Sequence, residues 1–346
     1  MKKTFGALAA RVGTVLAALV PVLAAGTALA DSGDYRPPTL ASRQKTFTTI
    51  LENDKFNQTD KWYTSGGKLV VSLPEPQQKR YIISPLLDLN AWVFDQPGFN
   101  RWELAIGQNI YEPADESLKT PDPKDRPYAG WLYVSAAAVA ENRGQQNILE
   151  VQFGVVGPWS LAKEFQDVTH NLIGSNKALG WDHQLSNEPG LVIGLSRRWR
   201  SNPEPVLGRL KWDLVPFAGA AVGNVQTYAN LGAQIRFGTG LRNDFGVPRI
   251  RPAGSAAVPL IRNDFSWYLF AGAEGWAVAH DIFLDGNTFE DSPSVEKKPL
   301  VGEFNLGFVA YVPSGRLNLT YVKRSKEFTD QPEAFEYGSA SFTFKF

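Results

Sequence analysis

The last ten residues of the chain, YGSASFTFKF, alternate between apolar and polar positions. Phe342, Phe344 and Phe346 fall on one side of an extended segment, and Thr343 and Lys345 fall on the other. A period of two predicts a β-strand with one apolar face. A final strand that ends on phenylalanine is typical of bacterial outer-membrane barrels, so this segment favours a membrane barrel over a periplasmic β-sandwich.

The same alternation recurs along the chain. In NILEVQFGVV, for example, Leu149, Val151 and Phe153 oppose Glu150 and Gln152. We therefore predict an all-β fold, a transmembrane antiparallel β-barrel. Its strands lie near residues 44–54, 61–73, 100–112, 127–141, 146–157, 189–200, 210–225, 228–242, 265–280, 298–312, 315–326 and 335–346. These make about twelve strands, and an even number returns both chain ends to the periplasmic side.

The connections between the predicted strands alternate between short and long, as in such barrels. The long ones cover residues 113–126, 158–188, 243–264 and 281–297. Segment 74–99 is also long, and parity assigns it to the periplasmic side, where long loops are unusual. The sequence offers no function for it.

One long connection contains FQDVTHNLIG, which lacks the two-residue period. It predicts a short helix, residues 160–172, in an extracellular loop. Gln166 and His170 are four residues apart and share one face of that helix. Because an imidazole titrates near neutral pH, His170 is a candidate general base.

The chain has two other histidines, and one of them competes with this assignment. His183 lies in the following loop with Asp182 and Glu188, and it is the rival base. His280 ends a predicted strand, and we assign it no chemistry. A lone histidine is more often structural than catalytic, and this applies to each of them.

The N-terminus predicts a secretory signal peptide, residues 1–30. It combines two lysines, an uncharged apolar stretch at 13–26 and the small-x-small sequence ALA before Asp31. The apolar stretch is too short to span a bilayer. Residues 31–346 then form a single barrel domain. Without the peptide, 32 basic residues face 35 acidic ones, a net charge of −3 that excludes a strongly basic nucleic-acid binder. The chain has no cysteine, which excludes disulfides and thiolate metal sites.

Polar residues near strand ends are candidates for a site. Asn53 and Asp54 end the first predicted strand, and Thr64 begins the second. They are either turn residues or oxygen ligands of Ca²⁺, with Asp54 as the carboxylate. Lys119 and Arg126 lie in the loop after the third strand, which is either a solvated loop or a cationic patch for phosphate.

An ordered set of motifs resembles the outer-membrane lipid A 3′-O-deacylase family from about residue 46 to the C-terminus. The motifs are Asn53-Asp54, Tyr63-Thr64-x-Gly66, Ile110-Tyr111-x-Pro113, Asp125-Arg126-Pro127-Tyr128-Ala129-Gly130, Val155-Val156-Gly157-Pro158, Gln166-x-x-x-His170-x-x-Ile173-Gly174 and Gly180-Trp181-x-x-Gln184. The resemblance implies a twelve-stranded barrel with a calcium-dependent esterase site between the barrel wall and the outer leaflet of the outer membrane.

The resemblance also implies roles for individual residues. It makes His170 the general base and Gln166 its helical partner. It adds Asn53, Asp54 and Thr64 to the site, with Ca²⁺ on Asp54. The family's site lysine falls on Lys119, with Lys124 as the alternative. A glutamate of the family has no counterpart, since Asn176 stands there, and Asp182 or Glu188 could take over its role.

The substrate implied is lipid A of lipopolysaccharide, and we expect a monomer in outer-membrane lipid. An ester hydrolase there needs a base, a water and a group that holds the oxyanion. No G-x-S-x-G sequence is present, which argues against the α/β-hydrolase route. The alternatives are an outer-membrane phospholipase and a non-catalytic barrel such as a porin or adhesin. Tyr268, Phe270 and Trp276 should point inward and fill the lumen, which disfavours a porin.

Overall fold

The computed structural model describes residues 44–54, 62–74, 84–94, 101–142, 144–174, 177–241, 244–254, 265–313 and 315–346. The predicted signal peptide, residues 1–30, lies outside the described residues and stays a prediction. Among the helices of the described part, none is long and apolar enough to cross a membrane.

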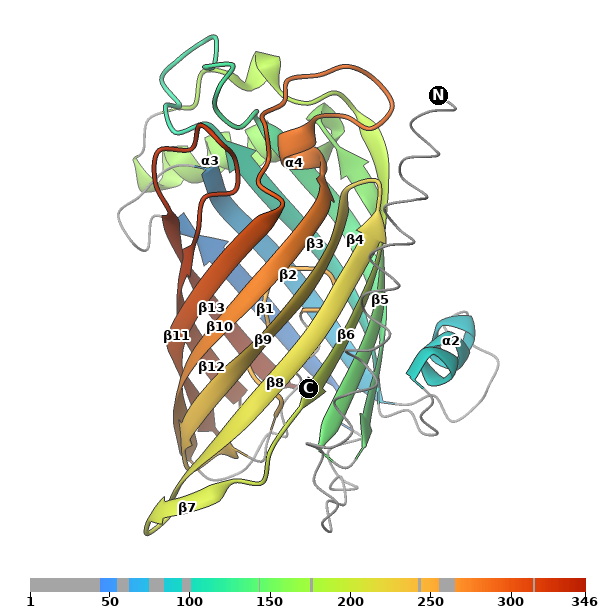
Figure 1. Cartoon of the computed structure of the whole chain (residues 1–346), viewed down its shortest axis with the longest axis vertical. Coiled ribbons are helices and arrows are strands. Elements are labelled where there is room, and N and C mark those ends of the chain that lie inside the picture. Colours follow the sequence, from blue (N-terminus) through green and yellow to red (C-terminus); the bar gives the residue numbers. More distant parts are fainter. Residues whose placement is uncertain are drawn as a thin grey trace.

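The chain forms one closed antiparallel barrel (Figure 1). Except for β6 and β7, strands adjacent in sequence pair with one another. The ring closes because β1 pairs with β13 and β6 pairs with β8. The long strands are β1 (Thr46–Asn53), β2 (Trp62–Pro74), β3 (Arg101–Glu112), β4 (Ala129–Asn142), β5 (Gln145–Val156), β6 (Glu188–Trp199), β8 (Leu210–Gly223), β9 (Gln226–Gly238), β10 (Ser266–Asp281), β11 (Leu300–Val312), β12 (Gly315–Arg324) and β13 (Phe335–Lys345). Each overlaps a predicted strand, so the fold prediction is confirmed. The short exposed strand β7 (Glu204–Leu207) was not predicted.

Side chains along each strand alternate between the lumen and the outer wall. On β3, Glu103 and Asn109 are buried, whereas Leu104 and Ile106 are 45% and 48% exposed. Exposed apolar side chains on other strands continue this outer face, among them Leu51, Leu69, Val134, Phe153, Leu231 and Leu319. An exposed apolar wall of this extent is stable against lipid rather than water, so the barrel spans a membrane.

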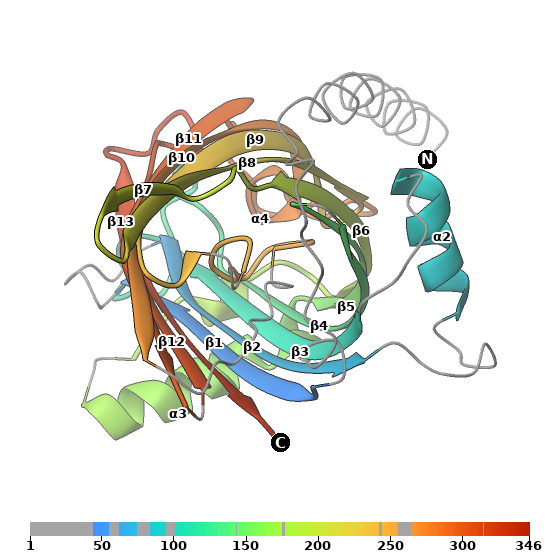
Figure 2. The same ribbon diagram turned by 90° about the horizontal axis from the view of Figure 1, so that it is seen from below.

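The lumen is filled by a plug, residues 244–254, which follows β9 and folds back into the ring (Figure 2). Asp244 of the plug pairs with Arg316 of β12 at 3.0 Å. Arg249 pairs with Glu52 of β1 at 3.0 Å. Buried charges are stable only when they are paired, so these contacts hold the plug across the lumen.

The plug belongs to the predicted connection 243–264. That connection follows a strand that runs toward the periplasmic end, so parity puts it at the end opposite the extracellular loops. Val247 of the plug packs with Tyr268 and Phe270, and both rings are buried as predicted. The packed lumen therefore disfavours a porin.

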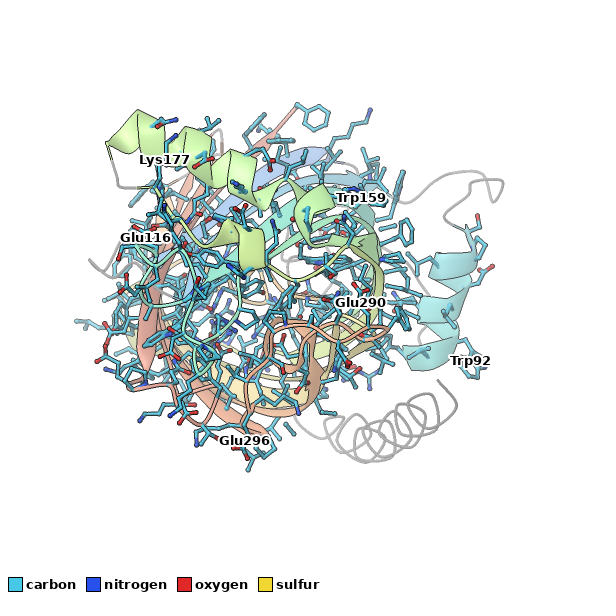
Figure 3. The ribbon with its side chains drawn as sticks, turned by 90° about the horizontal axis from the view of Figure 1, so that it is seen from above. Trp92, Glu116, Trp159, Lys177, Glu290 and Glu296 are labelled. Atoms are coloured by element: carbon cyan, nitrogen blue, oxygen red, sulfur yellow. The ribbon has the colours of Figure 1, made fainter. Side chains whose placement is uncertain are left out.

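The helix α2 (Ser84–Phe94) forms within segment 74–99 and lies outside the ring, against β4 and β5 (Figure 2). Asn90 donates a hydrogen bond to the carbonyl of Ala138 at 3.3 Å. Trp92 points away from the barrel and is 80% exposed (Figure 3). The unusual periplasmic connection is thus partly a helix that packs on the outer wall.

A second external helix, α3 (Ala162–Ile173), lies at the extracellular end and is preceded by the short turn η4 (Pro158–Ser160). It confirms the helix predicted at residues 160–172. Figure 2 shows it outside the ring, on the opposite side from α2. The short helix α4 (Ile282–Asp285) lies at the same end as α3 (Figure 1).

Candidate active site

The helix α3 has two different faces. Gln166 and His170 are 4% and 3% exposed, whereas Phe165 and Val168 are 56% and 59% exposed. The prediction that Gln166 and His170 share a face is confirmed, and that face packs on the barrel. The opposite face carries exposed apolar side chains, as expected of a helix that contacts lipid.

The close packing of α3 on the barrel depends on Gly130 of β4. A β-carbon at Gly130 would lie 2.0 Å from Oγ of Ser160 and 2.3 Å from Cβ of Ala162. Gln108 of β3 also donates from Nε2 to the carbonyl of Ser160 at 2.6 Å. The start of the helix is therefore fixed to the outer wall of β3 and β4.

Glu112, the last residue of β3, joins the helix to the strands. Its side chain is fully buried, and its Oε2 accepts a hydrogen bond from Nε2 of Gln166 at 2.5 Å. Its Oε1 accepts a short hydrogen bond from the hydroxyl of Thr64. Gln166 accepts in turn from the indole N–H of Trp181 at 2.6 Å. These four residues, which we call the Glu112 group, fix the amide of Gln166 in one orientation.

The end of β1 lies beside the Glu112 group. Asn53 pairs with Ser65, and the next position of this register brings Asp54 level with Thr64. The pairing of β2 with β3 shifts between Tyr63 and Ser65, so Thr64 occupies a β-bulge. Bulges re-aim side chains, and here the hydroxyl of Thr64 is directed to β3. The fold thus brings the predicted residues of β1, β2 and α3 to one place.

Glu112 was not among the residues that the sequence singled out. It is the unspecified position of the Ile110-Tyr111-x-Pro113 motif. Every second residue from Leu104 lies on the outer wall, and this parity places Glu112 there too. A carboxylate at a lipid-facing strand position is energetically unfavourable unless it has hydrogen-bond partners. An acid at such a position is the sequence signal that could have identified Glu112.

Tyr128 closes the group from the side of β4. Its ring is fully buried, 4.9 Å from the ring of Trp181. Burial, and then the negative charges of Glu112 and Glu116, raise the pKa of Tyr128 above its ordinary value. The phenol therefore keeps its proton near neutral pH.

The two candidate lysines lie exposed on the loop between β3 and β4. This loop contacts the segment that carries Trp181, because the backbone N–H of Leu179 donates to the carbonyl of Glu116 at 2.8 Å. The loop that carries Lys119 and Lys124 therefore lies against the segment that leads to Trp181, and both lysines are exposed on it. Their assignment to the site stays a prediction.

Arg126 has a different position from the lysines. It is 1% exposed, lies over the ring of Tyr111 at 5.0 Å and donates to Glu327 at 3.2 Å. These partners lie inside the barrel mouth. The structure therefore does not bring Arg126 to the outer surface, where its predicted phosphate contact would be.

His183, the rival base, is exposed at the end of the turn η5 (Trp181–His183). Its neighbour Asp182 is also exposed and pairs with Lys163 at 3.4 Å. Glu188 is buried in a separate set of contacts and accepts from Asn224 at 2.8 Å. Within the described residues, the carboxylate that contacts Gln166 is that of Glu112. The transfer of the family glutamate's role to Asp182 or Glu188 stays a prediction.

His280 has Nε2 at 2.8 Å from the carbonyl of Asn224 and Nδ1 at 3.2 Å from Asp285, so both its ring nitrogens have partners. Asn176 lies outside the described residues.

The oxygen atoms around Asp54 suit a hard cation. Asp54 is fully buried at the end of β1, and the hydroxyl of Thr64 and the carboxylate of Glu112 lie on the next two strands. Ca²⁺ prefers six to eight such oxygen ligands, including neutral ones. No three or more His, Asp or Glu side chains of the described chain form a metal centre by themselves. A calcium ion here would therefore need hydroxyl, carbonyl or water oxygens as well.

The surface next to the site is apolar. Trp159 and Leu161, at the start of the helical region, are 70% and 53% exposed. In Figure 3, Trp159 and Lys177 mark the two ends of the segment that crosses the outer wall. The buried polar residues thus lie between the barrel and a helix whose outer face suits lipid.

Comparison with protein families gives one match. The profile of the family described as "Outer membrane protein LpxR" matches residues 14–346. No curated protein sequence matches the chain.

Comparison with solved structures gives further matches, of which two are described. LpxR from Salmonella typhimurium is 20% identical, with a TM-score of 0.69, over 87% of this chain and 100% of the other. The β domain of the Bordetella autotransporter BrkA is 11% identical, with a TM-score of 0.44, over 88% of this chain and 99% of the other. The first of these shows the same fold.

Proposed function

Because the chain belongs to the family of outer membrane protein LpxR and is an outer-membrane β-barrel, we propose that it is a lipid A 3′-O-deacylase. The enzyme would hydrolyse the ester that links an acyl chain to the 3′ position of lipid A. The observation that supports this most is a buried polar group on the outside of the barrel wall. Gln166 and His170 lie there on the buried face of α3, and the outer face of the same helix carries exposed apolar side chains that suit a membrane lipid.

His170 is the proposed general base. It removes a proton from a water molecule, which attacks the ester carbonyl, and it returns the proton to the leaving alkoxide. The helix α3 carries the imidazole on its buried face, so the base is held in position and away from bulk water. This route has no covalent intermediate and needs no serine nucleophile.

The Glu112 group positions these reactants. Glu112 and Trp181 fix the amide of Gln166, which orients α3 and the water, and Thr64 and Asn53 line the same place. Asp54 would hold Ca²⁺, and a bound calcium ion would polarise the ester carbonyl. Lys119 or Lys124 would pair with a lipid phosphate at the exposed edge.

The proposal is tested by incubating the folded protein with lipid A and with phosphatidylethanolamine. We expect mass spectrometry to show loss of the 3′-acyl chain from lipid A and no change in the phospholipid. Cleavage of phosphatidylethanolamine alone would instead identify a phospholipase. Cleavage of neither lipid, in detergent or in vesicles, would support a non-catalytic barrel.

Glu112 offers a test of the positioning role. Glu112→Gln replaces an acceptor that serves two donors, so one hydrogen bond to Thr64 or Gln166 is lost. We expect a fall in kcat of about 10–100-fold, typical when an outer partner of site residues is removed. KM should change little, because Glu112 is buried and away from the exposed edge.

The matched control is Asp115→Asn, which neutralises a fully exposed acid on the adjacent loop. It should leave kcat unchanged. A wild-type kcat for Glu112→Gln would show that the buried carboxylate does not support the reaction.

A further inference from the structure

The outer wall of β10, β11, β12 and β13 contains an apolar groove of about 600 Å³. Figure 1 shows these four strands side by side. The volume lies within the range of ~300–1,000 Å³ that is usual for ligand sites. The residues that line the groove include none of the Glu112 group, and the mechanism above does not use them.

Small side chains form the floor of the groove and large ones form its walls. Gly338 and Ala340 lie on the outer side of β13, where a bulky residue would fill the space. Leu306 and Leu319, 45% and 48% exposed, and the half-buried Tyr321 stand beside them. The lining is almost entirely apolar, so the groove suits a hydrocarbon chain.

The upper end of the groove meets the candidate active site. Gly338 pairs across the barrel seam with Asn53 of β1, and on its other side it pairs with Tyr321 of β12. Paired strands lie about 4.8 Å apart, so the floor of the groove begins one strand away from a site residue.

From that end the groove descends into the membrane. The row of paired residues runs from Asn53, the last residue of β1, through Gly338 and Tyr321 to Leu306 and Ala271. Ala271 lies ten residues from Asp281, where β10 ends at the extracellular side. Ten residues correspond to about 33 Å along a strand. Because the strands are tilted, the row of paired residues therefore moves away from the extracellular end of the barrel as it leaves the site.

A second outer groove, of about 470 Å³, lies on the other side of the site. It is lined by Ile106, Val134 and Phe153 of β3, β4 and β5, and by Trp159. The contact between Gln108 and the carbonyl of Ser160 lies between this groove and the Glu112 group. This second groove is therefore an apolar surface that can be compared with the groove on β10–β13, but it is not continuous with Asn53.

We propose that the groove on β10–β13 receives the acyl chain whose ester is hydrolysed, and that it selects for the length of that chain. This inference rests on the proposed deacylase function. Bilayer lipids are as apolar as the groove, so packing and not water exclusion provides the preference. The ester held at the active site keeps its own chain at high effective concentration beside Gly338.

The activity test compares Ala340→Trp with the control Val134→Trp. Both residues face lipid, and a new indole in the first case fills the floor of the groove. We expect Ala340→Trp to lower the preference for long over short 3′-acyl chains by about tenfold, the size of a one- or two-methylene discrimination. Val134→Trp should keep the wild-type preference. Equal preferences in the three proteins would overturn the proposal.

A binding test separates this inference from the function itself. Lipid A with a photoreactive group near the end of its 3′-acyl chain is cross-linked to the wild-type protein, and labelled peptides are identified by mass spectrometry. Labels concentrated on residues 300–324 and 335–345 support the groove even if no ester is cleaved. Labels spread evenly around the wall, or concentrated near Val134, would overturn it, even if deacylation proceeds.

Discussion

Replacing His170 with alanine is expected to slow deacylation of lipid A by about 10²–10⁴-fold, the usual contribution of a positioned proton acceptor. The imidazole is buried on the face of α3 that packs on the barrel. The helix lies outside the strand pairings, so the barrel should still assemble. The rate is measured by mass spectrometry of the released fatty acid, and folding is checked by gel mobility before and after heating.

Two other variants define what this result means. His183→Ala is the matched control, because His183 is exposed on the neighbouring turn, and its rate should stay near that of the wild type. Gln166→Ala should cost less than His170→Ala, because the amide positions groups and accepts no proton. Loss in His183→Ala with a normal His170→Ala would show that the base was assigned to the wrong histidine. Normal rates in both would remove a histidine base from the mechanism.

Removal of calcium, either with EDTA or by Asp54→Ala, is expected to abolish measurable hydrolysis. A Lewis acid at an ester carbonyl contributes several kcal/mol, and each ~1.4 kcal/mol is a factor of ten in rate. Added Ca²⁺ should restore the chelated wild-type protein and should not restore Asp54→Ala. Binding of Ca²⁺ measured by calorimetry should be lost in the variant as well.

Asp182→Ala is the control for this second experiment, since it removes an exposed acid close to α3 without affecting the end of β1. It should hydrolyse lipid A at the wild-type rate and depend on Ca²⁺ in the same way. Full activity of the wild-type protein in excess EDTA would exclude calcium from the reaction, and the role of Asp54 would then be structural.

The sequence by itself determined the barrel, because the evidence for it is local. A period of two is visible within each strand, as in Leu149, Val151 and Phe153. The apolar face of each strand can therefore be predicted from the residues of that strand alone. The helix with Gln166 and His170 was identified for the same reason, since four residues of spacing are enough to place both on one face. The strand boundaries differ from the predicted ones by a few residues, as strand ends carry the weakest pattern.

The tertiary structure alone decided which polar groups meet. Glu112 contacts Thr64 and Gln166, which are 48 and 54 residues away in the chain, and no local pattern records such distances. The same holds for Arg249 and Glu52, 197 residues apart, whose pairing fixes the plug inside the lumen. Arg126 lies in the same loop of the sequence as Lys119 and Lys124. In the fold, however, its side chain points into the mouth of the barrel and donates to Glu327. A buried charge must find its partner in space, and strand pairing around a closed barrel sets which partners come within reach.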